Sequence, residues 1–186
     1  FENTPKENYP LLLHYHPLVI GRYQVCKQAD LVLAQFSQGE YFDLEQKKRD
    51  YDYYEKITTH DSSLSTCIFS IMGSEVGYFK KSYEYFLKSV RLDLDDYKGN
   101  TKDGIHAANM GGAWMCITFG FAGMRIVNNS LHFHPHLPED WELLRFILRF
   151  KGSLLQVQLS KDKTEYGLLE GEPLEIFENE NAIKLV

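Results

Sequence analysis

The chain has 186 residues, of which 44% are hydrophobic and 14% are aromatic. This composition excludes an intrinsically disordered chain and leaves room for one domain or two small ones with a substantial core. The net charge of -6 excludes a general attraction to nucleic acid. The longest apolar stretch, residues 110–124, is interrupted by glycines and is too short to span a membrane.

Two further features concern the ends and the cysteines. The first residues are polar and show no signal-peptide pattern. The chain begins with Phe1 rather than Met, so we expect it to be a piece of a longer protein. Cys26, Cys67 and Cys116 lie far apart, which favours buried free thiols over disulfides or a metal site.

Residues up to 127 carry apolar side chains at helical spacing, and they predict four helices. Three amphipathic helices are indicated by the apolar stripes at residues 25–36, 68–79 and 83–94. The fourth, residues 105–123, is apolar on all sides, so we expect it to be buried on all sides. The charged and aromatic segment 38–54 is interpreted as a loop or a partly helical excursion.

Residues 128–186 alternate between apolar and polar side chains, which is typical of strands. One predicted strand carries Leu155, Val157 and Leu159 on one face, with Gln156 and Gln158 on the other. Similar alternation at residues 146–150 and 174–177, with turn sequences between, predicts an antiparallel sheet of four or five short strands with one face buried.

Several hydroxyl groups precede the second predicted helix, in the segment 58–65. Thr59 or Asp61 is a suitable N-cap, and Ser62 and Ser63 follow directly. A helix N-terminus presents unpaired N–H groups and partial positive charge, so this segment has the chemistry to hold phosphate. The alternative is a simple cap without a ligand.

Two other segments carry candidate binding groups. Asp103 is a suitable cap for the fourth helix, and it would place His106 in the first turn, either as a donor to an anion or as a core histidine. Lys27 and Gln28 lie in an otherwise apolar predicted helix, where they would hydrogen-bond sugar hydroxyls or else face solvent.

Acidic and histidine clusters complete the candidates. Asp93, Asp95 and Asp96 gather at a predicted helix C-terminus, which is unfavourable for the helix dipole unless cations or backbone N–H groups of the next loop pair with them. We favour such a structural cluster over a glycosidase pair of carboxylates. The histidines of segment 132–136 alternate like metal ligands, but prolines at positions 135 and 138 interrupt the strand, and no cysteine lies close in sequence.

Five motifs occur in one order along the chain. Because of this set, the chain resembles the C-terminal part of glycoside hydrolase family 65. That family contains inverting disaccharide phosphorylases, which act on maltose, trehalose, kojibiose or nigerose. The motifs are Lys27-Gln28-Ala29-Asp30, the segment 58–65, the segment 91–96, Gly104-Ile105-His106 and the segment 120–125.

The resemblance implies an α+β multidomain fold. Residues 1–127 would form the C-terminal portion of an (α/α)6 barrel, and residues 128–186 a small antiparallel β-sandwich domain. The implied reaction is cleavage of an α-glucosidic bond in a maltose-like disaccharide by inorganic phosphate, which gives β-glucose 1-phosphate and glucose. The resemblance further implies a cytoplasmic homodimer that needs no cofactor and no metal.

The resemblance also assigns roles to individual residues. Lys27 and Gln28 match the family's pair at the donor glucose, and Ser62, Ser63 and His106 match its phosphate-binding groups, with His60 beside them. The family's catalytic glutamate, a general acid, matches no residue here and is expected upstream. The chain alone is therefore expected to be inactive, and its incomplete helical part is expected to expose apolar surface or self-associate.

Two other functions stay open at this point. One is a non-catalytic carbohydrate-binding or assembly module, in which exposed aromatic residues of segment 51–54 would stack on sugars. The other is a metal-dependent hydrolase that uses the three histidines of segment 132–136.

Overall fold

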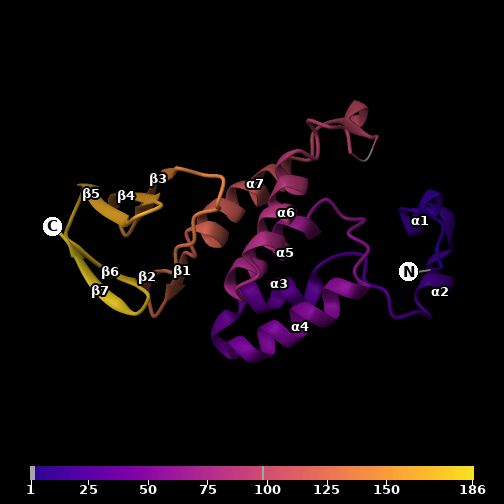
Figure 1. Ribbon diagram of the computed structural model, residues 1–186, viewed down its shortest axis with the longest axis horizontal. Helices are drawn as coiled ribbons and strands as arrows, with labels where there is room; N and C mark the ends of the chain where they lie inside the picture. The colour runs from indigo at the N-terminus through magenta and orange to yellow at the C-terminus, as the bar shows by residue number, and fades with distance from the viewer. Residues whose placement is uncertain (1–2, 98) are drawn as a thin grey trace. The chain divides into compact units, whose positions relative to one another are not determined.

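The computed structural model describes residues 3–97 and 99–186. The chain divides into two compact units, Phe1–Cys116 and Ile117–Val186, which are described one at a time (Figure 1). The first unit is helical and the second consists of strands, which confirms the predicted combination of a helical part and a small β domain. The predicted boundary at residue 127 stays a prediction.

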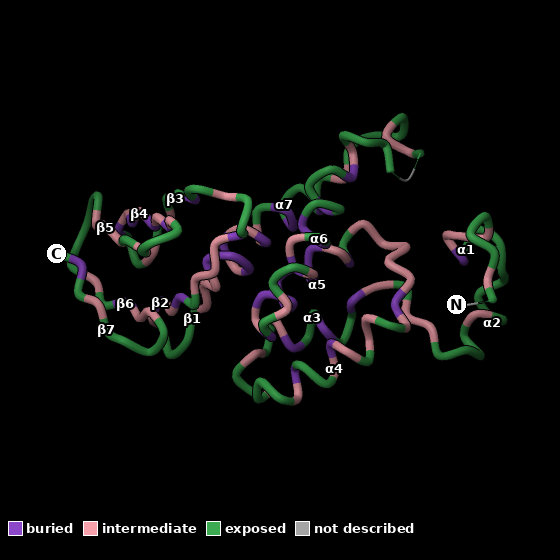
Figure 2. The backbone as a smooth tube through the Cα atoms, in the orientation of Figure 1, coloured by how far each residue is buried: buried purple, intermediate pink, exposed green. Residues whose placement is uncertain are grey.

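Helices of the first unit surround a central one. Helix α5 is buried along nearly its whole length, and it contacts α3, α4, α6 and α7 (Figure 2). The helices are α1 (Leu11–His14), α2 (Pro17–Ile20), α3 (Asp30–Ser37), α4 (Leu44–Ile57), α5 (Ser65–Glu75), α6 (Phe79–Val90) and α7 (Ala107–Met115). Short turns of helix lie at η1 (Lys6–Asn8), η2 (Gly39–Tyr41) and η3 (Thr101–Asp103).

Small residues allow α5 and α6 to approach closely. A Cβ atom on Gly73 would lie 3.3 Å from the backbone of Ser82. The Ser82 hydroxyl donates to the carbonyl of Ser70 at 2.7 Å, and it exchanges a 2.7 Å hydrogen bond with the hydroxyl of Ser74. These buried hydroxyls therefore find partners inside the helix pair, as buried polar groups must.

The prediction of a loop at residues 38–54 is wrong, because Leu44–Ile57 forms the 14-residue helix α4. The Asp43 carboxylate caps this helix by accepting from the backbone N–H of Gln46 at 2.7 Å. Tyr51 is fully buried, and the amine of Lys47 pairs with Glu75 of α5 at 2.5 Å. A buried tyrosine and polar contacts such as this ion pair thus bind to the core a helix whose other side chains are mostly charged or exposed.

The four predicted helices differ from expectation, three of them at an end and the fourth in its burial. The first begins only at Asp30, because Cys26 forms a parallel bridge with Thr58 instead of continuing the helix. The second ends at Glu75, and Phe79, the last residue of its apolar stripe, begins α6. The third ends at Val90, and Leu94 is 80% exposed beyond it. The fourth is not buried on all sides: in α7, Met110 is 56% exposed and Trp114 is 51% exposed.

The second unit contains two sheets. One has the order β1 (Arg125–Val127), β2 (Ser130–Phe133), β6 (Leu174–Glu178), β7 (Asn181–Leu185), and the other has the order β3 (Leu143–Phe150), β4 (Ser153–Ser160), β5 (Thr164–Glu170). A turn of π-helix, η4 (Cys116–Phe121), precedes them. The prediction of a single antiparallel sheet is wrong in two respects. There are two sheets, and β2 and β6 run parallel within the first of them. The chain leaves β2, builds the second sheet, and returns beside β2 in the same direction.

Alternating side chains pack the two sheets together. Leu155, Val157 and Leu159 are buried on one face of β4, as their spacing predicts. The ring of Phe133 on β2 lies 5.0 Å from that of Tyr166 on β5, and the Tyr166 hydroxyl donates to Glu178 of β6 at 2.7 Å. These contacts join the sheets, so the unit is a small sandwich with its own core.

Candidate functional site

A cleft of about 630 Å³ in the first unit brings together four residues that the sequence singles out. These are His60, Ser62, Ser63 and His106. The other lining residues come from the N-terminal segment, from α5 and α6, and from the loops around them: Tyr9, Pro10, Leu13, Thr59, Asp61, Thr66, Tyr85, Lys88, Leu92, Tyr97 and Asn100.

The start of α5 forms one wall of this cleft. The helix begins at Ser65, with Leu64 in the cap position and no side-chain cap, so the predicted caps Thr59 and Asp61 are wrong. A turn precedes the helix, in which the Ser62 hydroxyl accepts from the N–H of Leu64 at 3.3 Å. Uncapped N–H groups and the helix dipole make such a helix start favourable for an anion.

His60 holds this wall in place through hydrogen bonds of both ring nitrogens. Its Nδ1 lies 2.8 Å from the Ser65 hydroxyl, and its Nε2 lies 3.0 Å from the hydroxyl of Tyr85. The Tyr85 hydroxyl also donates to Glu55 at 2.9 Å, and Glu55 pairs with the amine of Lys81 at 3.1 Å. Direct contact of the His60 ring with phosphate, as predicted, would require one of these bonds to break.

The direction of these hydrogen bonds follows from Glu55. A carboxylate only accepts, so the Tyr85 proton points to Glu55 and the Tyr85 oxygen accepts from Nε2–H of His60. Nδ1 then accepts from the Ser65 hydroxyl. Burial first, and then the nearby Glu55 carboxylate, raise the pKa of Tyr85, which keeps this hydroxyl protonated as a donor.

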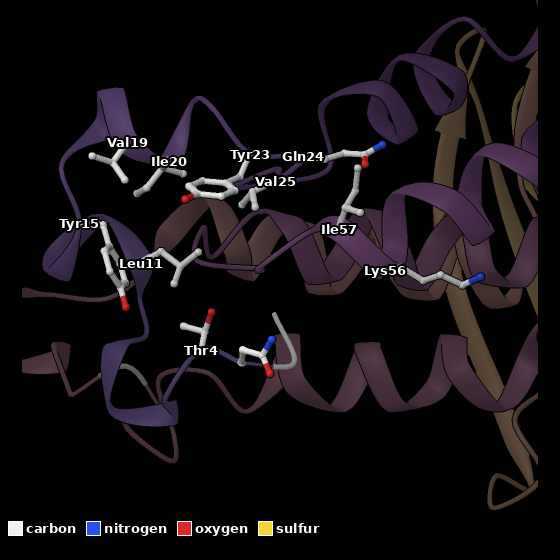
Figure 3. A pocket seen from close by; sticks show the side chains of 11 residues that line it. Thr4, Leu11, Tyr15, Val19, Ile20, Tyr23, Gln24, Val25, Lys56 and Ile57 are labelled. Atoms are coloured by element: carbon white, nitrogen blue, oxygen red, sulfur yellow. The ribbon is translucent and has the colours of Figure 1, made fainter.

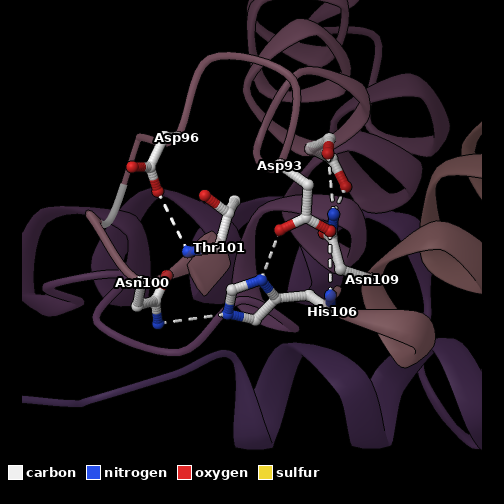
Figure 4. Close-up of polar contacts among 7 residues, drawn as sticks. Asp93, Asp96, Asn100, Thr101, His106 and Asn109 are labelled. Carbon is white, nitrogen blue, oxygen red and sulfur yellow. Dashed lines mark hydrogen bonds and ion pairs between the residues drawn. The ribbon is translucent and has the colours of Figure 1, made fainter. Parts of the chain in front are cut away.

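His106 also lines the cleft, and it lies directly before α7. Its backbone N–H donates to one oxygen of Asp93 at 2.8 Å, and its Nδ1 lies 2.5 Å from the other (Figure 4). The hydrogen bond from the His106 ring is the main cause that holds the pKa of Asp93 below its usual range. The predicted cap Asp103 is wrong, because Asp103 ends η3 and α7 begins only at Ala107.

The acidic cluster after α6 has the partners that the sequence predicts. Asp95 pairs with Arg91 at 2.6 Å. Asp96 accepts from the backbone N–H of Thr101 at 3.0 Å, and Asp93 accepts from that of His106, so two carboxylates bind backbone N–H groups of the next loop (Figure 4). The cluster is therefore a structural anchor for the loop that carries His106.

Lys27 and Gln28 lie outside this cleft, and outside the helix in which they were predicted. Both precede α3, where Lys27 is exposed and the Gln28 amide donates to Asp30 at 2.7 Å. The backbone of this segment does approach the cleft, because the Thr59 hydroxyl lies 3.4 Å from the carbonyl of Cys26.

Sequence reasoning missed Lys88 and Asn100 in this cleft. Lys88, on α6, holds its amine 5.0 Å from the ring centre of Tyr85, one turn earlier on the same helix face. Tyr85 and Lys88 are three residues apart, so a helix places them on the same face, and this spacing could have indicated that Lys88 lies near Tyr85. Asn100 gave no signal, because it reaches the cleft through the loop between α6 and α7. Among the lining residues described, Lys88 is the one lysine or arginine.

A second pocket, of about 700 Å³, contains none of the predicted site residues. It is lined mainly by apolar and aromatic side chains of the N-terminal segment and the end of α4 (Figure 3). Its lining includes Leu11, Tyr15, Val19, Tyr23 and Ile57.

The histidine segment forms no metal site in the part of the chain that the structure describes. The His132 ring stacks on Phe177 with 4.5 Å between ring centres, and His134 lies 3.5 Å from Glu180. In the aromatic segment 51–54, Tyr51 is fully buried and donates to the carbonyl of Phe69, whereas Tyr53 is 46% exposed. The buried Tyr51 ring is therefore not available to a sugar, and stacking of a sugar on Tyr53 stays a prediction.

The remaining expectations concern the thiols and the membrane. Cys67 and Cys116 are buried free thiols, as predicted, and burial raises the pKa of Cys116 to about 12. Cys26 is a free thiol that is only partly buried. No helix in the described ranges has the length and apolar character that crossing a bilayer requires.

Comparison with known proteins matches both parts of the chain. Residues 1–115 match the glycosyl hydrolase family 65 central catalytic domain, and residues 124–185 match the C-terminal domain of that family. The chain is 52% identical to an α,α-trehalose phosphorylase of Thermoanaerobacter brockii over 99% of its own length and 24% of that protein. It is 35% identical to a maltose phosphorylase of Bacillus subtilis, again over 99% of its length and 24% of that protein.

Solved structures agree with the sequence matches. A protein from human microbiome assigned as a kojibiose phosphorylase superposes on the chain with a TM-score of 0.93 at 34% identity, over 100% of this chain and 25% of that one. The chain thus spans about a quarter of the length of the relatives it matches. The helical unit with its cleft and the two-sheet unit belong to glycosyl hydrolase family 65.

Proposed function

We propose that this chain forms the phosphate-binding side of an inverting disaccharide phosphorylase. The observation that carries the proposal is the cleft in which Ser62, Ser63, Lys88 and His106 converge on the start of α5. Hydroxyl groups, a lysine and uncapped backbone N–H groups are the donors that proteins use for phosphate.

The proposed reaction needs these groups to hold the nucleophile. An oxygen of phosphate attacks the anomeric carbon, a new C–O bond to phosphate forms, and the glycosidic C–O bond breaks with inversion. The leaving sugar oxygen takes a proton from a general acid, which the family resemblance assigns to a glutamate outside this segment. Because phosphate replaces the attacking water, its orientation in the cleft contributes directly to the rate.

The relatives favour trehalose as the disaccharide over the maltose-like substrate of the sequence interpretation. Trehalose phosphorylases are 52% and 54% identical to the chain, a kojibiose phosphorylase 43%, and a maltose phosphorylase 35%. We therefore propose α,α-trehalose as the substrate of the intact enzyme that carries this segment. Lys27 and Gln28 remain proposed contacts to the donor glucose, and the 186-residue chain alone is proposed to be inactive.

Product analysis tests this function. The intact enzyme is incubated with inorganic phosphate and, separately, with trehalose, kojibiose or maltose, and the sugar phosphate is identified by NMR. We expect β-glucose 1-phosphate from trehalose and much less from the other two. Release of free glucose without sugar phosphate would contradict the phosphorylase proposal, and a preference for maltose or kojibiose would contradict the substrate alone.

A further inference from the structure

One side of α6 faces the cleft and carries a positive charge. Tyr85 and Lys88 line the cleft from this helix, and Leu92 lines it from the turn that follows. The spacing of three and four residues places such side chains on one face. Within the described ranges the Lys88 amine contacts the Tyr85 ring and takes part in no ion pair. Its charge is therefore available to a ligand in the cleft.

The Tyr85 ring holds the Lys88 amine beside the cleft. The amine lies 5.0 Å from the ring centre, a distance at which the face of an aromatic ring attracts a cation. The ring is itself fixed, because it is buried and its hydroxyl is hydrogen-bonded to Glu55 and to His60. A long side chain loses rotamer freedom when a ligand fixes it. Contact with a fixed ring limits this loss, because it restricts the amine before a ligand arrives.

A doubly charged phosphate needs positive charge in this cleft. Asp61 lines the cleft, and Asp93 contacts the ring of His106. Serine hydroxyls and backbone N–H groups donate hydrogen bonds but carry no net charge. An ammonium group donates hydrogen bonds and carries a full charge, so it binds an oxyanion more strongly than a neutral donor does. Lys88 is thus the group in the lining that offsets the charge of phosphate.

Resting on the proposed function, we propose that Lys88 neutralises the phosphate group in this cleft and that Tyr85 is a positioning residue whose ring holds the amine in place. The ligand class is a doubly charged oxyanion. It is inorganic phosphate in the direction of cleavage and the phosphate group of the sugar 1-phosphate in the direction of synthesis. Water is neutral and gains nothing from this charge, so Lys88 favours phosphate over water as the nucleophile.

Replacing Lys88 in the intact enzyme tests the charge. Lys88→Met keeps an unbranched side chain without the charge, so we expect the KM values for phosphate and for β-glucose 1-phosphate to rise at least about tenfold, with the trehalose KM within about twofold of wild type. Lys88→Arg restores the charge and should restore most of the affinity. Lys80→Met removes the same charge from α6 outside the cleft lining and should change no KM.

Salt dependence separates a charge effect from a structural one. Dissolved ions screen the attraction between the amine and phosphate, so the wild-type phosphate KM should rise with the concentration of potassium chloride. The rise should be less steep in Lys88→Met, which has lost the charge. A lysine that only covers the Tyr85 ring would leave both enzymes with the same salt dependence, and that result would overturn the role of its charge.

Two substitutions of Tyr85 test the ring. Tyr85→Phe and Tyr85→Leu both lose the hydroxyl, but only Tyr85→Leu loses the ring. We expect Tyr85→Leu to raise the phosphate KM more than Tyr85→Phe does when Lys88 is present. In a Lys88→Met background this difference should vanish, because the ring then has no amine to hold. A difference that persists in that background overturns the positioning role of the ring.

The Ser63→Ala variant separates failure of this inference from failure of the proposed function. If Ser63→Ala raises the phosphate KM and Lys88→Met does not, the assignment of Lys88 is overturned and the proposed function stands. If neither substitution changes the phosphate KM, phosphate does not bind this cleft. The proposed function then fails, and the inference fails with it.

Discussion

At the residue scale, the cleft depends on side chains that hold its walls as well as on those that line it. His60 adopts a positive φ of 56°, which is uncommon for a residue other than glycine. Both of its ring nitrogens are engaged, and its ring packs on Phe69 with 4.9 Å between ring centres. The strained backbone is thus fixed by contacts with Ser65 and Tyr85, and the next residues, Asp61, Ser62 and Ser63, enter the cleft from it.

Replacing Tyr85 with phenylalanine tests this support. Tyr85→Phe leaves Nε2–H of His60 without its acceptor, which should cost about 1–3 kcal/mol of unfolding free energy. The loosened loop should also raise the phosphate KM more than the disaccharide KM. Denaturant unfolding and steady-state kinetics measure the two effects. Tyr41→Phe, at an exposed side chain, is the control, and equal behaviour of both variants would contradict the supporting role.

Sequence patterns alone did not place residues that are far apart along the chain at one site. Ser62 and Ser63 line one cleft with His106, and their roles in phosphate binding stay predictions. Lys88 and Asn100 join them from other elements, and only the packing of α6 and its following loop reveals this. The sequence predicted that carboxylates of this cluster accept hydrogen bonds from the next loop. It did not predict that Asp93 accepts from the backbone N–H of His106.

At the element scale, periodicity identified helices better than it identified their ends. The stripes at residues 68–79 and 83–94 both correspond to real helices, α5 and α6. Their ends depend on caps and turns that an apolar stripe does not encode. Helix α4 was missed because its attachment to the core depends on a buried tyrosine and on ion pairs rather than on an apolar stripe.

Two adjacent glycines of α7 give a matched test of helix packing. A Cβ atom on Gly112 would lie 2.5 Å from the Cys67 sulfur, whereas one on the exposed Gly111 would meet nothing within 4 Å. Gly112→Ala should therefore destabilise the first unit by about 1–3 kcal/mol through overpacking. Gly111→Ala should stabilise it by up to about 1 kcal/mol, because alanine favours the helix. Thermal unfolding of both variants measures the difference, and equal effects would contradict the packing of α7 on α5.

At the scale of the whole molecule, the sequence predicted that the chain divides into a helical part and a β domain. It did not predict the parallel pairing of β2 with β6, because register and direction depend on a partner strand that is 45 residues away in sequence. The exposed Met110 and Trp114 agree with the expectation that the helical part presents apolar surface.

Phosphate should act on only one of the two units, because the lining of the cleft comes from the first unit alone. At a phosphate concentration of 100 times its Kd, binding should raise the unfolding free energy of the first unit by about 2.7 kcal/mol. Hydrogen exchange should slow at the start of α5 and in the loop before α7, and stay unchanged in β3, β4 and β5. Equal protection of both units would place the site elsewhere.

Phosphate binding in this cleft is measured by the phosphate KM of two serine variants. Ser63→Ala removes a hydroxyl that lines the cleft, whereas Ser37→Ala removes one that donates to the carbonyl of Leu33 at the end of α3. For Ser63→Ala in the intact enzyme, we expect a phosphate KM raised about tenfold, or about 1.4 kcal/mol, with the disaccharide KM within about twofold of wild type. Ser37→Ala should change neither. An unchanged phosphate KM in Ser63→Ala, or a change confined to the disaccharide KM, would contradict it.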